Sequence, residues 1–220
     1  MQLIDDLVAE HDLIEQVLGS LRTYAERRRE GIGDPADGAA FLRFFRLFAG
    51  HFHHAREEEV LFPALVQRAE LPADRGPIAA MVAEHARMAG ILDQLDPLLR
   101  AGALDREAAD RLGSLAVAYS HALWHHIDAE NSVLLPEAET RLRRAFVREL
   151  EGRSATPEEQ EAREQGIRLC AAYPPLVDRD VLRGDGCVHC PSFGDGCRGL
   201  EREWWNPWEW EEFEDQMPKD

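Results

Sequence analysis

The amino-acid sequence predicts an all-α fold: an antiparallel up-down four-helix bundle with an internal pseudo-twofold repeat, followed by a small irregular C-terminal module. Three observations lead to this prediction. Four long stretches have the apolar spacing of amphipathic helices, the first two stretches resemble the last two, and the composition changes after Leu150. We therefore divide the 220 residues into a bundle at 1–150 and an acidic tail, rich in cysteine and tryptophan, at 151–220.

The first half of the predicted bundle contains two helices. Apolar residues of the first helix recur with helical spacing at Leu3, Leu7, Ile14, Leu18 and Leu21. A cluster of glycine, proline and aspartate at 31–38 predicts a loop after it. The second helix is expected over about 39–70, where Pro63 should kink or restart it.

The second half of the predicted bundle repeats this arrangement. A third helix is expected over about 78–100 and a fourth over about 107–150, with Pro136 interrupting the fourth. Four helices joined by short connections favour an antiparallel bundle.

Two sequence motifs occur twice. VAEH stands at 8–11 and at 82–85, and HHAREEEVLFP at 53–63 aligns with HIDAENSVLLP at 126–136. The offsets of 74 and 73 residues pair the first two helices with the last two. Residues at equivalent positions should therefore meet near the pseudo-twofold axis of the bundle.

The repeat places histidine and glutamate at equivalent positions on four helices. A histidine interrupts the apolar face of the first and third helices, and a histidine followed four residues later by glutamate lies on the second and fourth. A spacing of four puts both side chains on one helix face, one turn apart. The candidate metal ligands are His11, His53, Glu57, His85, His126 and Glu130.

These six side chains indicate a dinuclear metal site. Six ionisable groups in a core would cost a large free energy unless a cation compensates them. Four imidazoles and two bridging carboxylates suit two first-row ions, as in di-iron bundles. We favour two iron ions, with manganese as the alternative; a site holding only zinc would use the same ligands.

EHD at 10–12, EHA at 84–86 and the two long motifs resemble the hemerythrin HHE cation-binding domain family over about residues 1–145. The resemblance implies a di-iron centre held by the same six residues. It also implies a protein that binds or reacts with O2, NO or peroxide, in a stress-response or iron–sulfur repair role. Oxygen-carrying hemerythrins have a further histidine where this chain has Ala89, so reactivity is favoured over oxygen carriage. The alternative is an iron or oxygen sensor that signals through the C-terminal module, and enzymatic turnover is left open.

Other polar residues flank the predicted ligands. His54 and His125 each follow or precede a ligand position by one residue and should point about 100° away from it. We expect them to be outer or surface groups. Glu58 and Glu59 are expected to be solvated, although either could hydrogen-bond a ligand histidine.

The tail contains a second candidate metal site, spaced C-x16-C-x2-C-x6-C, at Cys170, Cys187, Cys190 and Cys197. Four thiolates favour one zinc ion, with an iron–sulfur cluster as a weaker alternative. His189 could replace Cys170, and cysteines without metal remain a third interpretation. The tryptophan-rich segment 204–210 is expected to cover the bundle or to dock a protein partner.

The net charge of −17 excludes nucleic acid and anionic membranes as expected partners, because both attract clustered lysine and arginine. The N-terminal segment lacks the pattern of a secretory signal, and no apolar run has membrane-spanning length. We expect a cytoplasmic protein whose partner is a small diatomic ligand or peroxide, with a possible protein partner at the tail.

Overall fold

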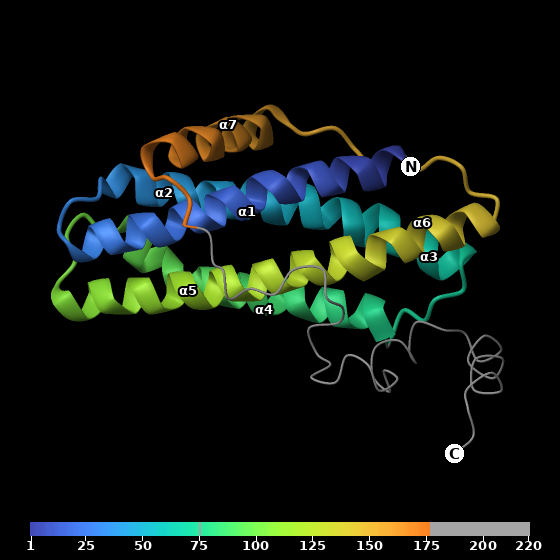
Figure 1. Ribbon diagram of the computed structural model, residues 1–220, viewed down its shortest axis with the longest axis horizontal. Helices are drawn as coiled ribbons and strands as arrows, with labels where there is room; N and C mark the ends of the chain where they lie inside the picture. Colours follow the sequence, from blue (N-terminus) through green and yellow to red (C-terminus); the bar gives the residue numbers. More distant parts are fainter. Residues whose placement is uncertain (75, 177–220) are drawn as a thin grey trace, which may run out of the picture.

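Every regular element is helical in residues 1–74 and 76–176, the part of the chain that the computed structural model describes. The all-helical prediction is confirmed for this part. Four helical stretches run along the long axis of the molecule and form a bundle (Figure 1). They are α1 (Gln2–Arg29); α2 (Pro35–Arg43), η1 (Phe44–His54), η2 (Glu57–Leu61) and α3 (Phe62–Arg68); α4 (Gly76–Arg100); and α5 (Arg106–Ala129), η3 (Glu130–Leu134) and α6 (Leu135–Arg144). None of the described helices is long and apolar enough to cross a membrane.

The second stretch begins earlier than the sequence predicted. The segment 31–38 was expected to be a loop, but helix α2 begins at Pro35. The Asp34 side chain accepts a hydrogen bond of 2.9 Å from the backbone N–H of Ala36, so Asp34 caps the helix. Proline is favoured in the first helical turn because its missing N–H would have no partner there.

The fourth stretch ends earlier than predicted. Helix α6 ends at Arg144 instead of near Leu150, and Phe146 adopts a positive φ of 62°, which turns the chain. The two prolines that were expected to interrupt the long stretches lie within α3 and α6. Pro63 and Pro136 occupy the first turn after a π-helical segment, and the chain stays helical through both.

The apolar core consists of two clusters with a polar layer between them. On α1, Leu7 belongs to one cluster and Ile14 to the other, and the buried His11 lies between them in the sequence. His85 has the same position on α4. Packing on both sides buries the histidines of this layer.

An additional helix covers one side of the bundle. Helix α7 (Pro157–Ala172) packs against α1, α2 and η1 and contributes to the larger apolar cluster (Figure 1). Thr156 and Glu159 form a capping box at its start. Gly166 permits the close approach, since a Cβ atom there would lie 2.5 Å from the Phe44 ring. The sequence also predicts a short helix over about 157–171, which α7 confirms, whereas the rest of the predicted module, 177–220, lies outside the described residues.

Candidate metal centre

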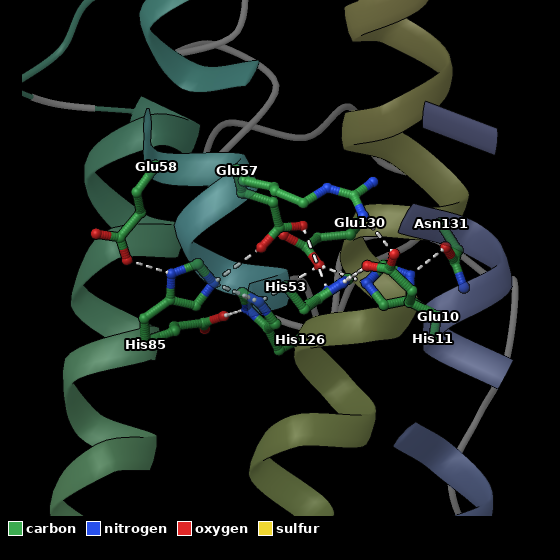
Figure 2. Close-up of polar contacts among 11 residues, drawn as sticks. Glu10, His11, His53, Glu57, Glu58, His85, His126, Glu130 and Asn131 are labelled. Carbon is green, nitrogen blue, oxygen red and sulfur yellow. Dashed lines mark hydrogen bonds and ion pairs between the residues drawn. The ribbon is translucent and has the colours of Figure 1, made fainter. Parts of the chain in front are cut away.

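The six predicted ligands converge in the polar layer from all four helical stretches (Figure 2). We define the first half of the centre as His11 and His53, from α1 and η1, and the second half as His85 and His126, from α4 and α5. All four imidazoles are buried.

Two fully buried carboxylates join the halves. Glu130 Oε2 lies 3.2 Å from His11 Nε2 and 3.4 Å from His126 Nε2. Glu57 Oε1 lies 3.6 Å from His53 Nε2, and its Oε2 lies 3.5 Å from His85 Nε2. Each carboxylate thus contacts one histidine of each half, as a bridging ligand must.

Both carboxylates begin a π-helical segment. Glu57 is the first residue of η2, Glu130 is the first residue of η3, and His53 lies near the end of η1. In a π-helix the hydrogen bond spans one residue more than in an α-helix, and such segments are frequent at functional sites. The sequence repeat therefore produces a repeated backbone feature at the site.

In the first half, outer hydrogen bonds orient both imidazoles. His53 Nδ1 lies 2.8 Å from Glu10 Oε2, and His11 Nδ1 lies 2.7 Å from Asn131 Oδ1. Glu10 also accepts a hydrogen bond of 2.5 Å from the buried Arg56 guanidinium. Because these oxygens accept, Nδ1 carries the proton and the Nε2 lone pair faces the interior.

The second half has the same arrangement. His126 Nδ1 lies 2.9 Å from Glu84 Oε2, and His85 Nδ1 lies 2.6 Å from Glu58 Oε1. Glu58 was expected to be solvated, with a hydrogen bond to a histidine as the alternative, and it forms that hydrogen bond. The roles of Glu10, Glu84 and Asn131 were not predicted from the sequence. The two Nε2 atoms of this half are 2.9 Å apart. Burial would lower the pKa of His126, but Glu130 and Glu84 outweigh it and the pKa is raised, so a protonated His126 can donate this hydrogen bond to His85.

Burial sets the charge states of the centre. It raises the pKa of Glu57 well above its usual value, and the neighbouring Glu130 raises it further. Burial would also raise the pKa of Glu130, but His126 and His11 outweigh it, and the pKa is lowered. Burial and facing imidazoles lower the pKa of His53 and His85, which keeps them in the neutral, metal-binding form.

The donor atoms fit a pair of metal ions. Both oxygens of Glu57, both oxygens of Glu130 and His11 Nε2 are buried, and they have no hydrogen-bond partner among the described residues. Such groups are costly in a protein interior unless something binds them. Potential ligand atoms within 4.8 Å of one another form two groups that share Glu57: His11, His53, Glu57 and Glu130; and His54, Glu57, His85 and His126.

His54 does not point away from the centre as the sequence predicted. Its ring stacks on His85 with centroids 3.8 Å apart and planes 9° apart, and burial lowers its pKa to about 3. A direction about 100° from His53 does not carry the side chain to the surface, because His85 and His126 lie on that side. Beside His54 and His85 lies a cavity of about 270 Å³, which Tyr119 and Ala89 also line.

The candidate cysteine site is described only at Cys170. This residue lies on α7, half-buried against the larger apolar cluster, and burial raises the pKa of its thiol. Cys187, Cys190 and Cys197 lie outside the described residues, as does the tryptophan-rich segment 204–210.

Comparison with known proteins agrees with this geometry. The family model described as hemerythrin HHE cation binding domain matches residues 2–138. Neither the curated proteins nor the solved structures gave a match. The matched range contains all six predicted ligands and their outer hydrogen-bond partners, and it covers more than half of the chain. The chain belongs to the hemerythrin HHE cation-binding domain family.

Proposed function

We propose that this chain is a non-haem di-iron protein whose two ions are held by His11, His53, Glu57, His85, His126 and Glu130. The observation that carries the proposal is the set of buried donor atoms without hydrogen-bond partners in the described part of the chain. Four carboxylate oxygens and an imidazole nitrogen face one another in a layer closed by apolar clusters on both sides.

Each residue has a distinct role in this proposal. Glu57 and Glu130 bridge the ions, because each contacts a histidine of both halves. The outer acceptors hold the Nδ1 protons, so that the histidines present Nε2. Bound iron would supply electrons and an open coordination position for O2, NO or peroxide. The apolar clusters on both sides bury the four histidines.

The donor set favours iron over structural zinc. Nitrogen and carboxylate oxygen suit iron and manganese, and a zinc ion needs only four ligands. The cavity beside His54 and His85 supports a small reactant, because it reaches the edge of the centre.

The proposal includes the antiparallel up-down order of the four helices and a pseudo-twofold axis through the centre. The matching outer hydrogen bonds of Glu10 and Glu84 support that symmetry. A stress-response role in the cytoplasm, a zinc ion at the cysteines and a protein partner at the tail remain proposals from the sequence.

Metal counting tests the proposal. The chain is purified without added metal, loaded with Fe(II) under anaerobic conditions, and its iron, manganese and zinc are measured per chain. We expect about two iron ions, and an absorption change when the loaded protein meets O2. His51→Ala serves as the control, since this exposed histidine precedes the ligand His53 by two residues. Fewer than two ions would contradict a dinuclear centre, and zinc that iron cannot replace would contradict the redox role.

A further inference from the structure

We propose that His54 is a fifth histidine ligand of the centre and binds the ion of the second half. This inference rests on the proposed function, because it assigns one more ligand to the same pair of ions. It makes the two ions inequivalent, with three histidines at one ion and two at the other.

The position of the imidazole supports this role. A ligand atom of His54 lies within 4.8 Å of ligand atoms of Glu57, His85 and His126. The ring is stacked on His85, and its centroid lies 5.8 Å from that of His126. The ring centroid of His54 also lies 5.6 Å from that of His53, but among the described residues its ligand atom groups with those of Glu57 and the second half.

The hydrogen bonding of His54 also favours its role as a metal ligand. His54 Nε2 is buried, and no described residue forms a hydrogen bond with it. A histidine kept for packing would leave this polar atom unsatisfied, at a cost of about 1–3 kcal/mol. The parallel ring of His85 offers no donor to it. A metal ion is the partner that would satisfy the atom where it lies.

The internal repeat supplies a matched comparison. The residue equivalent to His54 in the other half of the chain is Ile127, which is buried in the larger apolar cluster. An apolar side chain of similar size thus fits the same place in the fold. The histidine at 54 is not required by helix packing, which points to a function in the centre.

The test compares His54→Ile with the wild-type chain. Fe(II) affinities are measured anaerobically by competition with a chelator, and ⁵⁷Fe Mössbauer spectra report the coordination of each ion. We expect one ion to bind at least about 10-fold more weakly, and one quadrupole doublet to change while the other stays. The metal-free variant should unfold at the same or a higher denaturant concentration, because an unsatisfied polar atom has been removed.

The controls separate this inference from the proposed function. His51→Ile, on the same helical segment but exposed, should leave both affinities and both doublets unchanged. If His54→Ile does not fold, His54→Gln replaces it and should also change one doublet, since nitrogen is lost from the ion. Unchanged affinities and doublets in a folded variant would overturn the role of His54 alone. A wild-type chain that binds fewer than two ions would overturn the proposed function itself.

Discussion

The two halves of the centre share a plan but differ in their surroundings. In both, a glutamate that precedes one histidine accepts the Nδ1 proton of the other histidine in that half: Glu10 for His53 and Glu84 for His126. In the first half, Glu10 also pairs with the buried Arg56, whereas the repeat places the smaller Ala129 at the equivalent position. The arginine of the second half, Arg87, is exposed and lies 3.9 Å from Glu84.

This difference separates what the duplication fixed from what changed afterwards. Positions that are identical in the two repeats supply the six candidate ligands and the acceptors Glu10 and Glu84. The other two acceptors, Glu58 and Asn131, occupy equivalent positions that differ. Positions that differ supply Arg56 to the first half and His54 to the second. The first half therefore depends on a buried ion pair for stability, while the second gains an additional donor beside the cavity.

The bridging carboxylates give the largest expected effect, because they serve both halves. Glu57→Gln or Glu130→Gln should lower the affinity of the chain for both ions by more than about 100-fold. The loss of a direct ligand costs more binding free energy than the loss of an outer hydrogen-bond partner. His11→Ala should mainly weaken the ion of the first half. Fe(II) competition titrations measure both constants. A bridging variant that affects only one ion would show that the halves are independent.

Removing the acceptor Glu10 and removing the acceptor Glu84 should change the stability of the metal-free protein by different amounts. Above pH 7, Glu10→Ala should lower the free energy of unfolding by about 2–3 kcal/mol, because it leaves the Arg56 charge buried without its closest partner. Glu84→Ala should cost less than Glu10→Ala, because both variants leave a histidine Nδ1 without its acceptor but the Arg87 charge is solvated. Urea denaturation measures both. Equal losses of unfolding free energy in the two variants would show that the buried ion pair does not distinguish the halves. As a control, Glu10→Ala introduced into an Arg56→Leu variant should lose most of its effect.

The contact of α7 with η1 offers a smaller test on the side of the first half. Gly166→Ala should destabilise the protein by about 1–3 kcal/mol, because the new methyl group overlaps the Phe44 ring. Gly113→Ala, on α5, is the matched control: the described residues leave open space there, so it should stabilise by about 0.5–1 kcal/mol. Thermal unfolding of the two variants measures the difference. A neutral Gly166→Ala would mean that α7 does not pack closely on η1.

The start of α7 gives the smallest expected effect and depends on pH. Hydrogen bonds from Arg153 lower the pKa of Glu159 from 4.5 to about 2. A carboxyl group whose pKa is lower in the folded than in the unfolded chain stabilises the fold when the pH is above its pKa in the unfolded chain. This contribution is therefore complete above pH 4.5 and is lost as the pH falls toward 2. Arg153→Ala should remove about 1 kcal/mol at pH 6 and little near pH 2. A loss that is the same at both values would contradict the role of this pair.

The sequence was sufficient to predict the helices and the six polar side chains that the structure brings together, because both follow from helical spacing and from the repeat. His53 and Glu57 are four residues apart, and the repeat identifies their equivalents. The start of α2 was also readable from Asp34 and Pro35, a helix cap followed by a favoured first residue, but the glycine-rich context suggested a loop.

The remaining features depend on contacts between helices or on the backbone. Glu10 is adjacent to His11 in the sequence but accepts from His53 on another helix, so helix periodicity alone could not reveal the pairing. The inward position of His54 depends on His85 and His126, which reach it from other helices, so helix periodicity alone could not reveal it. Helix α7 lies in the predicted tail yet packs on the bundle, because Gly166 and Ala162 provide a surface flat enough for the contact.

Anomalous diffraction from crystals of the iron-loaded chain tests the central claim most directly. The account predicts two iron peaks about 3.5–4 Å apart in the polar layer, one beside His11 and His53 and the other beside His85 and His126. Glu57 and Glu130 should each bind both ions. A single peak, or iron bound away from these carboxylates, would contradict the dinuclear centre.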